Sequence, residues 1–472
     1  MSSVARVNQH VTAMLASTGG FAAGITLGWS SLAGWSLRGT LNWDSAKAEL
    51  VVGAVTLGAS CGALLLALLG ALATTPCDCR AILYHIAMPI FIAGWIVLCF
   101  AGEQMERLIV GRGLTGAGAG IFLIVIPLYI AELSSGSHRE CLLYGFHAAL
   151  SIGLAISYAL GAAFLPCKVT PVQEESSVAL DEYSAACAIA CLPLFLICIL
   201  PPSPLQMLLE GVESDGLVPI LRTLGWVASG DERQIAREID GLRMLVGALE
   251  QPRAKWKAFA NCRSLWAFIT VCCVSACYHL SGMIYVSLNL LTLLDFGATE
   301  QLTSGKLSII CGLIHVFVSL LAVWLVASLG RKNLAPLSSG LMGLCGNALG
   351  YYMLERNSDA DIMYTFSWIT WTWVVIYLCS FYLGIGPVYW SLLADFFPIQ
   401  TRLVAASIIS GLGWISYSVL NLYSSEWLLW LGIARSLWLF SSFCWFGMLL
   451  VYCLVPDGRY SLADLQLRFH IR

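Results

Sequence analysis

Long apolar stretches recur along the chain and are separated by short polar segments. A helix that crosses a membrane needs about 20 predominantly apolar residues, and twelve stretches approach or exceed that length. A transmembrane barrel would show short segments of alternating polarity instead. The pattern therefore predicts an all-α membrane protein with helices over residues 11–33, 48–73, 81–101, 108–132, 141–165, 183–200, 264–294, 303–328, 333–354, 362–393, 403–424 and 432–455.

One longer polar segment divides these twelve stretches into six and six. Such a division is typical of transporters built from two repeated six-helix halves. We expect an N-terminal half over residues 1–200, a cytoplasmic linker over 201–263, a C-terminal half over 264–456 and a tail over 457–472.

The linker contains a helical pattern of its own. Asp231 and Gln234 have the spacing of a capping box, and apolar residues then recur at helical spacing from Ile235 to Leu249. We expect short amphipathic helices under the cytoplasmic face of the membrane, with a solvated linker as the alternative.

The composition agrees with a membrane protein. Hydrophobic residues make up 58% of the 472 residues and charged residues 11%, whereas soluble proteins carry about 25% charged residues. A soluble enzyme and a disordered chain are thereby excluded, and a net charge of -3 gives no basic surface for nucleic acid. Most Lys and Arg residues fall on the side of the two termini, which places both termini in the cytoplasm.

Neither a cofactor nor a metal centre is expected. Most of the 18 cysteines lie inside apolar stretches, where cysteine behaves as a small hydrophobic residue. Cys77 and Cys79 are close in sequence, but no cluster of further ligands accompanies them. No phosphate-binding loop or nucleophile motif appears, so the chain is not expected to be an enzyme.

Charged residues mark the edges of several predicted helices. Glu132, Arg139, Asp395 and Arg402 each lie a few residues beyond an apolar stretch. Ions at a membrane edge are costly unless they are paired. Pairing between the two halves would hold one conformation closed, although these charges could also serve only to set the topology.

Several short motifs occur in a fixed order along the chain. They are Gly111-Arg112, Pro127-Leu-Tyr-Ile-Ala-Glu132 with Arg139, Leu280-Ser281-Gly282, Gly330-Arg331-Lys332, Gly384-Ile-Gly-Pro387-Val-Tyr-Trp390, and Asp395-Phe-Phe-Pro398 with Arg402. In this order the chain resembles the sugar porters of the major facilitator superfamily, and in particular the insect facilitated trehalose and glucose carriers. The resemblance covers nearly the whole chain.

The resemblance implies a solute pocket between the halves and a gate at the cytoplasmic side. The pocket residues it implies are His147, Tyr278, His279, His315, Trp390, Trp414 and Tyr417. The cytoplasmic gate it implies consists of Glu132, Arg139, Glu210, Arg331, Asp395 and Arg402.

The pocket departs from the family pattern. His147, His279 and His315 stand where the resemblance leads us to expect sugar-binding amides. A neutral imidazole has one donor and one acceptor, so it replaces part of an amide's hydrogen bonding. Imidazole also gains charge near neutral pH, and we therefore expect solute binding to depend on pH.

The first predicted helix lacks a feature of proton-coupled members. Those members carry an aspartate at the position that the resemblance matches to Thr26, and residues 11–33 contain no carboxylate. This favours facilitated diffusion over proton symport, although a histidine could still carry a proton.

These observations predict facilitative transport of a sugar such as trehalose or glucose across the plasma membrane. The expected partners are a small-molecule solute and the lipid bilayer, with no nucleic acid. Two alternatives stay open: a carrier for a non-sugar small solute, and a transport-inactive sensor or interaction protein of the same fold.

Overall fold

The computed structural model describes residues 2–39, 43–73, 77–136, 138–165, 173–212, 214–224, 232–247, 262–288, 290, 303–356 and 368–455. Within these ranges every regular element is a helix and there is no strand. The predicted all-α fold is therefore confirmed. The predicted tail, residues 457–472, and the predicted capping residue Asp231 lie outside the described residues.

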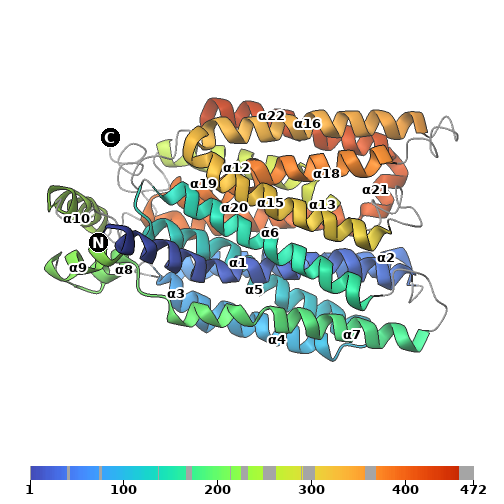
Figure 1. Cartoon of the computed structure of the whole chain (residues 1–472), viewed down its shortest axis with the longest axis horizontal. Helices are drawn as coiled ribbons and strands as arrows, with labels where there is room; N and C mark the ends of the chain where they lie inside the picture. The colour runs from blue at the N-terminus through green and yellow to red at the C-terminus, as the bar shows by residue number, and fades with distance from the viewer. Residues whose placement is uncertain are drawn as a thin grey trace.

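The first six predicted membrane spans all correspond to helices (Figure 1). The third begins as a short α-helix, passes through a π-helical turn and continues as an α-helix. The bounds are α1 (Ser2–Gly39), α2 (Ser45–Leu72), α3 (Cys79–Ile82) with η1 (Leu83–Ala87) and α4 (Met88–Cys99), α5 (Met105–Leu133), α6 (Arg139–Phe164), and α7 (Gln173–Ala190) with η2 (Leu192–Ile199).

The last six predicted spans also correspond to helices, two of which are broken in two. The bounds are α12 (Cys262–Leu280) with α13 (Met283–Leu288), α15 (Ser304–Leu329), α16 (Arg331–Arg356), α18 (Trp368–Leu383) with α19 (Ile385–Asp395), α20 (Ile399–Leu422), and α22 (Ile433–Leu454), preceded by the short α21 (Ser424–Leu431).

The helices form a membrane-spanning bundle. Among the described residues, eleven helical segments are long and apolar enough to cross a membrane. The one predicted span that is not among these eleven is the ninth in chain order, which corresponds to α16. This helix is 26 residues long, but its serine, glycine and asparagine residues lower its hydropathy. On α15, Phe317 and Trp324 are 67% and 69% exposed, as expected of side chains that contact lipid. The chain is a multi-pass membrane protein.

The sequence predicted one continuous helix over 362–393, but the structure breaks it at Gly384. Pro387 has no backbone N–H, so it cannot bond the carbonyl four residues earlier. The hydroxyl of Ser338 on α16 accepts from the N–H of Ile385 at 2.9 Å and donates to the carbonyl of Ser380 at 2.6 Å. The broken helix is thus held by a side chain from a neighbouring helix.

The predicted helix over 264–294 is broken as well, between α12 and α13. Gly282 has a φ of 81°, a left-handed conformation that glycine adopts without steric cost. A Cβ atom at this position would also meet the ring of Phe440 on α22 at 2.6 Å. The break therefore depends on glycine for its backbone angle and for its packing.

Glycines also set the distance between helices inside the N-terminal half. A Cβ atom at Gly58 of α2 would lie within 3 Å of the backbone of Gly113 on α5, and one at Gly116 of α5 would lie as close to the backbone of Val55. Small residues at such contacts let helices in lipid approach closely. Between the two halves, α2 packs against α20 and α6 packs against α15.

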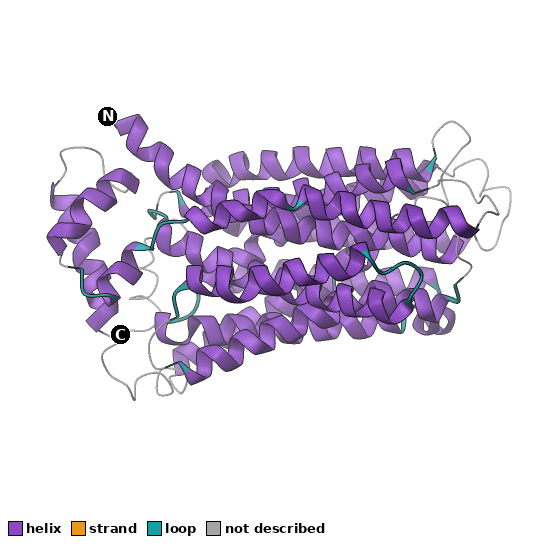
Figure 2. Ribbon diagram, turned by 90° about the horizontal axis from the view of Figure 1, so that it is seen from below, coloured by secondary structure: helices purple, strands orange, loops and turns teal. Residues whose placement is uncertain are grey.

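Three short helices gather at one end of the bundle, beside the beginning of α1 (Figures 1 and 2). They are α8 (Pro204–Leu209), α9 (Ser214–Leu224) and α10 (Glu232–Gly247), and we call this end of the molecule the linker end. In α10, Ile239 and Leu242 are buried whereas Asp240 and Arg243 are exposed. The predicted amphipathic helix is therefore present.

Candidate functional site

The seven residues predicted to line a pocket lie in one buried cluster of rings. They come from five helices of both halves: α6 supplies His147, α12 supplies Tyr278 and His279, α15 supplies His315, α19 supplies Trp390, and α20 supplies Trp414 and Tyr417. Each of them is at most 5% exposed. We call this set the ring cluster.

At one side of the ring cluster, histidines from the two halves meet on a shared tyrosine. The ring centroid of His147 lies 5.4 Å from that of Tyr382, and the centroid of His315 lies 4.7 Å from it in a stacked arrangement. One turn further along, the hydroxyls of Ser151 on α6 and Ser319 on α15 are 2.6 Å apart. The two halves are therefore in direct contact beside these histidines.

Tyr278 occupies the middle of the ring cluster. Its ring stacks on Tyr389 with centroids 4.4 Å apart, and it meets Trp390 edge-on at 6.0 Å. Trp390 in turn meets Phe146 of α6 at 6.3 Å. Aromatic contacts thus continue from the C-terminal half into the N-terminal half.

The other side of the ring cluster fixes the orientation of one imidazole. His279 Nδ1 lies 2.8 Å from the carbonyl oxygen of Ser275. Because a carbonyl can only accept, Nδ1 carries the hydrogen, and Nε2 of the neutral ring is left as an acceptor. The same ring lies 5.6 Å from Trp414, whose neighbour Gly413 leaves room for it.

Several buried polar atoms of the ring cluster have no hydrogen-bond partner among the described residues. They include both ring nitrogens of His147 and of His315, Nε2 of His279, Nε1 of Trp414 and the hydroxyl of Tyr417. Buried polar groups are normally paired, and each unpaired group costs about 1–3 kcal/mol. This concentration of unpaired atoms makes the ring cluster the candidate solute site.

The ring cluster contains no Asp, Glu, Lys or Arg side chain. Within the part of the chain that the structure describes, no group of three or more His, Cys, Asp or Glu residues is arranged to hold a metal ion. The chemistry available in the ring cluster is therefore neutral hydrogen bonding and contact with aromatic faces.

The predicted gate residues lie at the linker end, and five of the six form ion pairs between helices. Arg139 of α6 lies 3.6 Å from Asp395 of α19, and Arg331 of α16 lies 2.7 Å from the same carboxylate. Arg402 of α20 pairs with Glu132 of α5. Two of these pairs, Arg139–Asp395 and Arg402–Glu132, join the two halves.

The sixth predicted gate residue does not join these ion pairs. Glu210, which follows α8, is exposed and accepts a hydrogen bond from Gln206 at 3.1 Å. The linker reaches the gate through a different residue, because the Ser203 hydroxyl donates to Glu132 at 2.7 Å.

Sequence analysis missed one gate residue, Glu140. Its Oε1 lies 3.4 Å from Nε of Arg331, and its side chain is 8% exposed. An acid directly after Arg139, in the first turn of α6, was the signal available in the sequence.

A further buried cation lies between α1 and α5, away from any described carboxylate contact. Arg112 is fully buried, donates to the carbonyl of Thr26 at 2.9 Å and also to the Ser30 hydroxyl. Its guanidinium stands 4.6 Å from the centre of the Trp29 ring. Backbone, hydroxyl and aromatic ring stabilise this charge where an acid would otherwise be expected.

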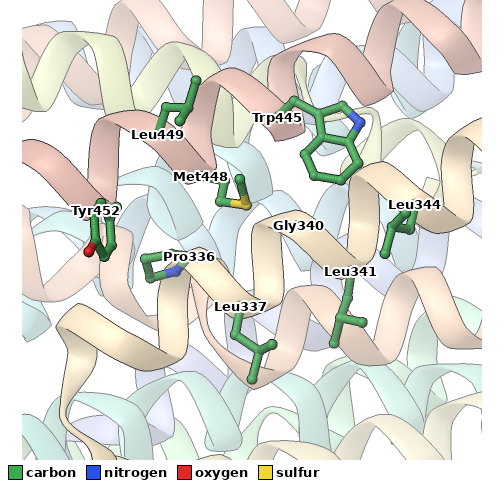
Figure 3. A pocket seen from close by; sticks show the side chains of 9 residues that line it. All are labelled: Pro336, Leu337, Gly340, Leu341, Leu344, Trp445, Met448, Leu449 and Tyr452. Atoms are coloured by element: carbon green, nitrogen blue, oxygen red, sulfur yellow. The ribbon is translucent and has the colours of Figure 1, made fainter.

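An apolar groove of about 510 Å³ lies between α16 and α22 (Figure 3). Gly340 forms its floor, with Trp445 and Tyr452 on the opposite helix, and Tyr452 is 64% exposed. The groove is open at the surface of the bundle, where Leu344 and Tyr452 are exposed, and it shares no residue with the ring cluster. It is therefore not part of the candidate site.

The chain is similar to known transporters over nearly its whole length. The sequence model of the family described as "Sugar (and other) transporter" matches residues 11–460. The solute carrier family 2 facilitated glucose transporter member 8 of Bos taurus is 25% identical over 474 residues, which cover 95% of this chain and 91% of that protein. The facilitated trehalose transporter Tret1 of Bombyx mori is 25% identical over 471 residues, which cover 98% and 86%.

Among solved structures, the chain is similar to the proton:xylose symporter XylE of E. coli bound to 6-bromo-6-deoxy-D-glucose. The TM-score is 0.79 at 18% identity, over 98% of this chain and 100% of that chain. At this identity the likeness shows the fold, which is that of the major facilitator superfamily.

Proposed function

The chain belongs to the sugar (and other) transporter family, and we propose that it is a facilitative carrier that moves a sugar across a membrane by alternating access. It is a transporter and not an enzyme. Relatives named for glucose and trehalose transport match nearly its whole length, and we propose these two sugars as the first solutes to test.

The observation that carries this proposal is the group of unpaired polar atoms in the ring cluster. Each sugar hydroxyl can both donate and accept a hydrogen bond. Small-molecule sites typically combine apolar and aromatic walls with a few convergent polar groups, and the ring cluster offers both. We propose that the solute binds there, between the halves.

Two ring nitrogens determine which hydrogen-bonding groups the solute must supply. His279 Nε2 needs a donor, because Nδ1 of the same ring already donates to Ser275. Trp414 Nε1 can only donate, so it needs an acceptor. The two rings are neighbours with centroids 5.6 Å apart, and we propose that they bind adjacent hydroxyls of one sugar ring.

We propose that the linker end is cytoplasmic and that its ion pairs form the cytoplasmic gate, in the plasma membrane. The excess of basic residues on this side supports the orientation. In this structure Glu132–Arg402 and Arg139–Asp395 hold the halves together there. Rocking of the halves about the central site would separate these pairs and release solute to the cytoplasm.

The surroundings of Arg112 support transport without proton coupling. The contacts of this guanidinium are the Thr26 carbonyl, the Ser30 hydroxyl and the Trp29 ring. None of these groups gains or loses a proton near neutral pH. We therefore propose facilitated diffusion that follows the solute gradient.

Uptake of labelled trehalose and labelled glucose into proteoliposomes containing the purified chain tests the proposal. We expect saturable net uptake that stops when the sugar concentrations inside and outside the proteoliposomes are equal. Trp414→Phe, which keeps a ring but removes the N–H donor, should raise the KM. Trp324→Phe, the same change at a lipid-facing position that is 69% exposed, is the matched control and should leave the KM unchanged.

A carrier for a non-sugar small solute is the second candidate. It is favoured by the chemistry of the ring cluster, since none of its seven residues is an amide. Competition distinguishes the two: an aromatic or anionic solute that binds while excess trehalose and glucose do not compete would exclude the sugar assignment. Binding of a sugar without any flux would instead indicate a transport-inactive sensor.

A further inference from the structure

The ion pairs at the linker end include an acid that belongs to neither of the inter-half pairs described above. Glu140 lies in the first turn of α6, and its partner Arg331 begins α16. The contact of 3.4 Å between them therefore joins the N-terminal half to the C-terminal half. Both side chains are at most 8% exposed, so solvent screens this pair little.

A count of charges shows what Glu140 adds. Arg139, Arg331 and Asp395 are each at most 1% exposed as side chains and together carry two positive charges and one negative charge. A buried charge without compensation is strongly destabilising. Glu140 supplies the second negative charge, which makes this buried group of four neutral.

The position of Glu140 also changes what Arg331 does. Arg331 and Asp395 both belong to the C-terminal half, so the 2.7 Å bond between them moves with that half. It does not hold the gate closed. Through Glu140, Arg331 is also attached to α6 of the other half.

Each half keeps a neutral pair of these four charges when the halves separate. Arg139 and Glu140 leave together on α6, and Arg331 and Asp395 stay together on the other half. Neither group carries net charge after the gate has opened. The Glu132–Arg402 pair differs, because its separation leaves one anion and one cation on opposite sides.

We propose that Glu140 is a positioning residue that stabilises the closed linker-end gate by drawing Arg331 onto the N-terminal half. The proposal rests on the proposed function only in assuming that this gate opens during the transport cycle. Glu140 touches no solute; it acts through Arg331.

Gate opening can be measured without any solute. Ala394 is fully buried next to Asp395, so Ala394→Cys should react with a membrane-impermeant maleimide only when the gate is open. In vesicles that expose the linker end, we expect Glu140→Gln to raise the labelling rate of this cysteine at least about tenfold. The parent protein without Ala394→Cys gives the background from native cysteines.

The matched control is Glu106→Gln, the same change at an exposed acid in the first turn of α5. It should leave the labelling rate unchanged. Glu140→Asp, which keeps the charge on a shorter side chain, should give an intermediate rate. Equal labelling in Glu140→Gln and Glu106→Gln would overturn the proposal.

A double-variant cycle shows whether Glu140 acts through Arg331. In an Arg331→Gln background, Glu140→Gln should cause no further increase, whereas additive effects would contradict the proposal. A general loss of folding would lower the thermal unfolding midpoint and expose all buried cysteines, not only that at 394. If gate labelling responds as expected while no sugar is transported, the sugar assignment fails and the role of Glu140 stands.

Discussion

A single added methyl group at Gly413 should weaken solute binding by displacing His279. A Cβ atom at this position would lie within 3 Å of three atoms of the His279 ring, including 2.7 Å from Nε2. Real Cβ atoms essentially never come so close. The ring must therefore move, and the movement also distorts or breaks its Nδ1 hydrogen bond to the Ser275 carbonyl at 2.8 Å.

The expected magnitude follows from the contact that is lost. If His279 Nε2 accepts one hydroxyl of the solute, its displacement removes one hydrogen bond worth about 0.5–1.5 kcal/mol. Since 1.4 kcal/mol corresponds to about a tenfold change in affinity, Gly413→Ala should raise the KM roughly 2- to 12-fold. The maximal rate should change less, because the ring does not take part in the gate.

The assay is saturable uptake into proteoliposomes, with Gly145→Ala as the matched control. Gly145 lies in α6, and a Cβ atom there would meet nothing within 4 Å, so alanine should be neutral or slightly stabilising. In a His279→Ala background the clash is absent, and Gly413→Ala should then have no additional effect. A KM for Gly413→Ala equal to that of Gly145→Ala would refute the assignment of His279 to the solute site.

Three further predictions concern pH, coupling and stability. His279 is buried among uncharged groups, which disfavours the charged form of its ring, so the external KM should stay constant as pH falls from about 8 to 5 and should not show the pH dependence expected from the sequence; a KM that rises over this range in the parent chain but not in His279→Gln would contradict a neutral ring. Sugar uptake should be insensitive to a protonophore, because no carboxylate is among the described partners of Arg112. Stimulation of uptake by an inward proton gradient would count against facilitated diffusion. Gly58→Ala should destabilise the N-terminal half by about 1–3 kcal/mol, because the added Cβ atom would meet the α5 backbone. The thermal unfolding midpoint in detergent measures this loss. A midpoint equal to that of Gly145→Ala would argue against the close α2–α5 contact.

The hydropathy pattern located the helices because burial in lipid imposes the same requirement on every span. It could not locate the breaks at Gly282 and Gly384. Each break depends on a neighbouring helix: Phe440 packs against the first, and Ser338 bonds both ends of the second. Such contacts are tertiary, and a sliding window along one stretch contains no information about them.

The ion pairs of the gate also show which single residues the sequence could and could not predict. Motif order predicted Glu132, Arg139, Arg331, Asp395 and Arg402, and the structure brings all five into ion pairs. The resemblance also implied Glu210 as a gate residue, yet this side chain is exposed and joins none of these ion pairs. It omitted Glu140, whose partner Arg331 lies 191 positions away in the chain and adjacent only in the fold.

The distribution of charge along the bundle suggests why the two sites have different chemistry. The gate uses full charges, and a buried charge that loses its partner is strongly destabilising. The ring cluster uses neutral imidazole, indole and phenol groups, and several of their buried polar atoms have no hydrogen-bond partner among the described residues. Each unpaired atom makes closure of the site less favourable, but its free-energy cost is far smaller than that of a buried unpaired charge. A solute that bonds even some of these atoms therefore offsets part of that cost, and the loaded carrier should close more readily than the empty one.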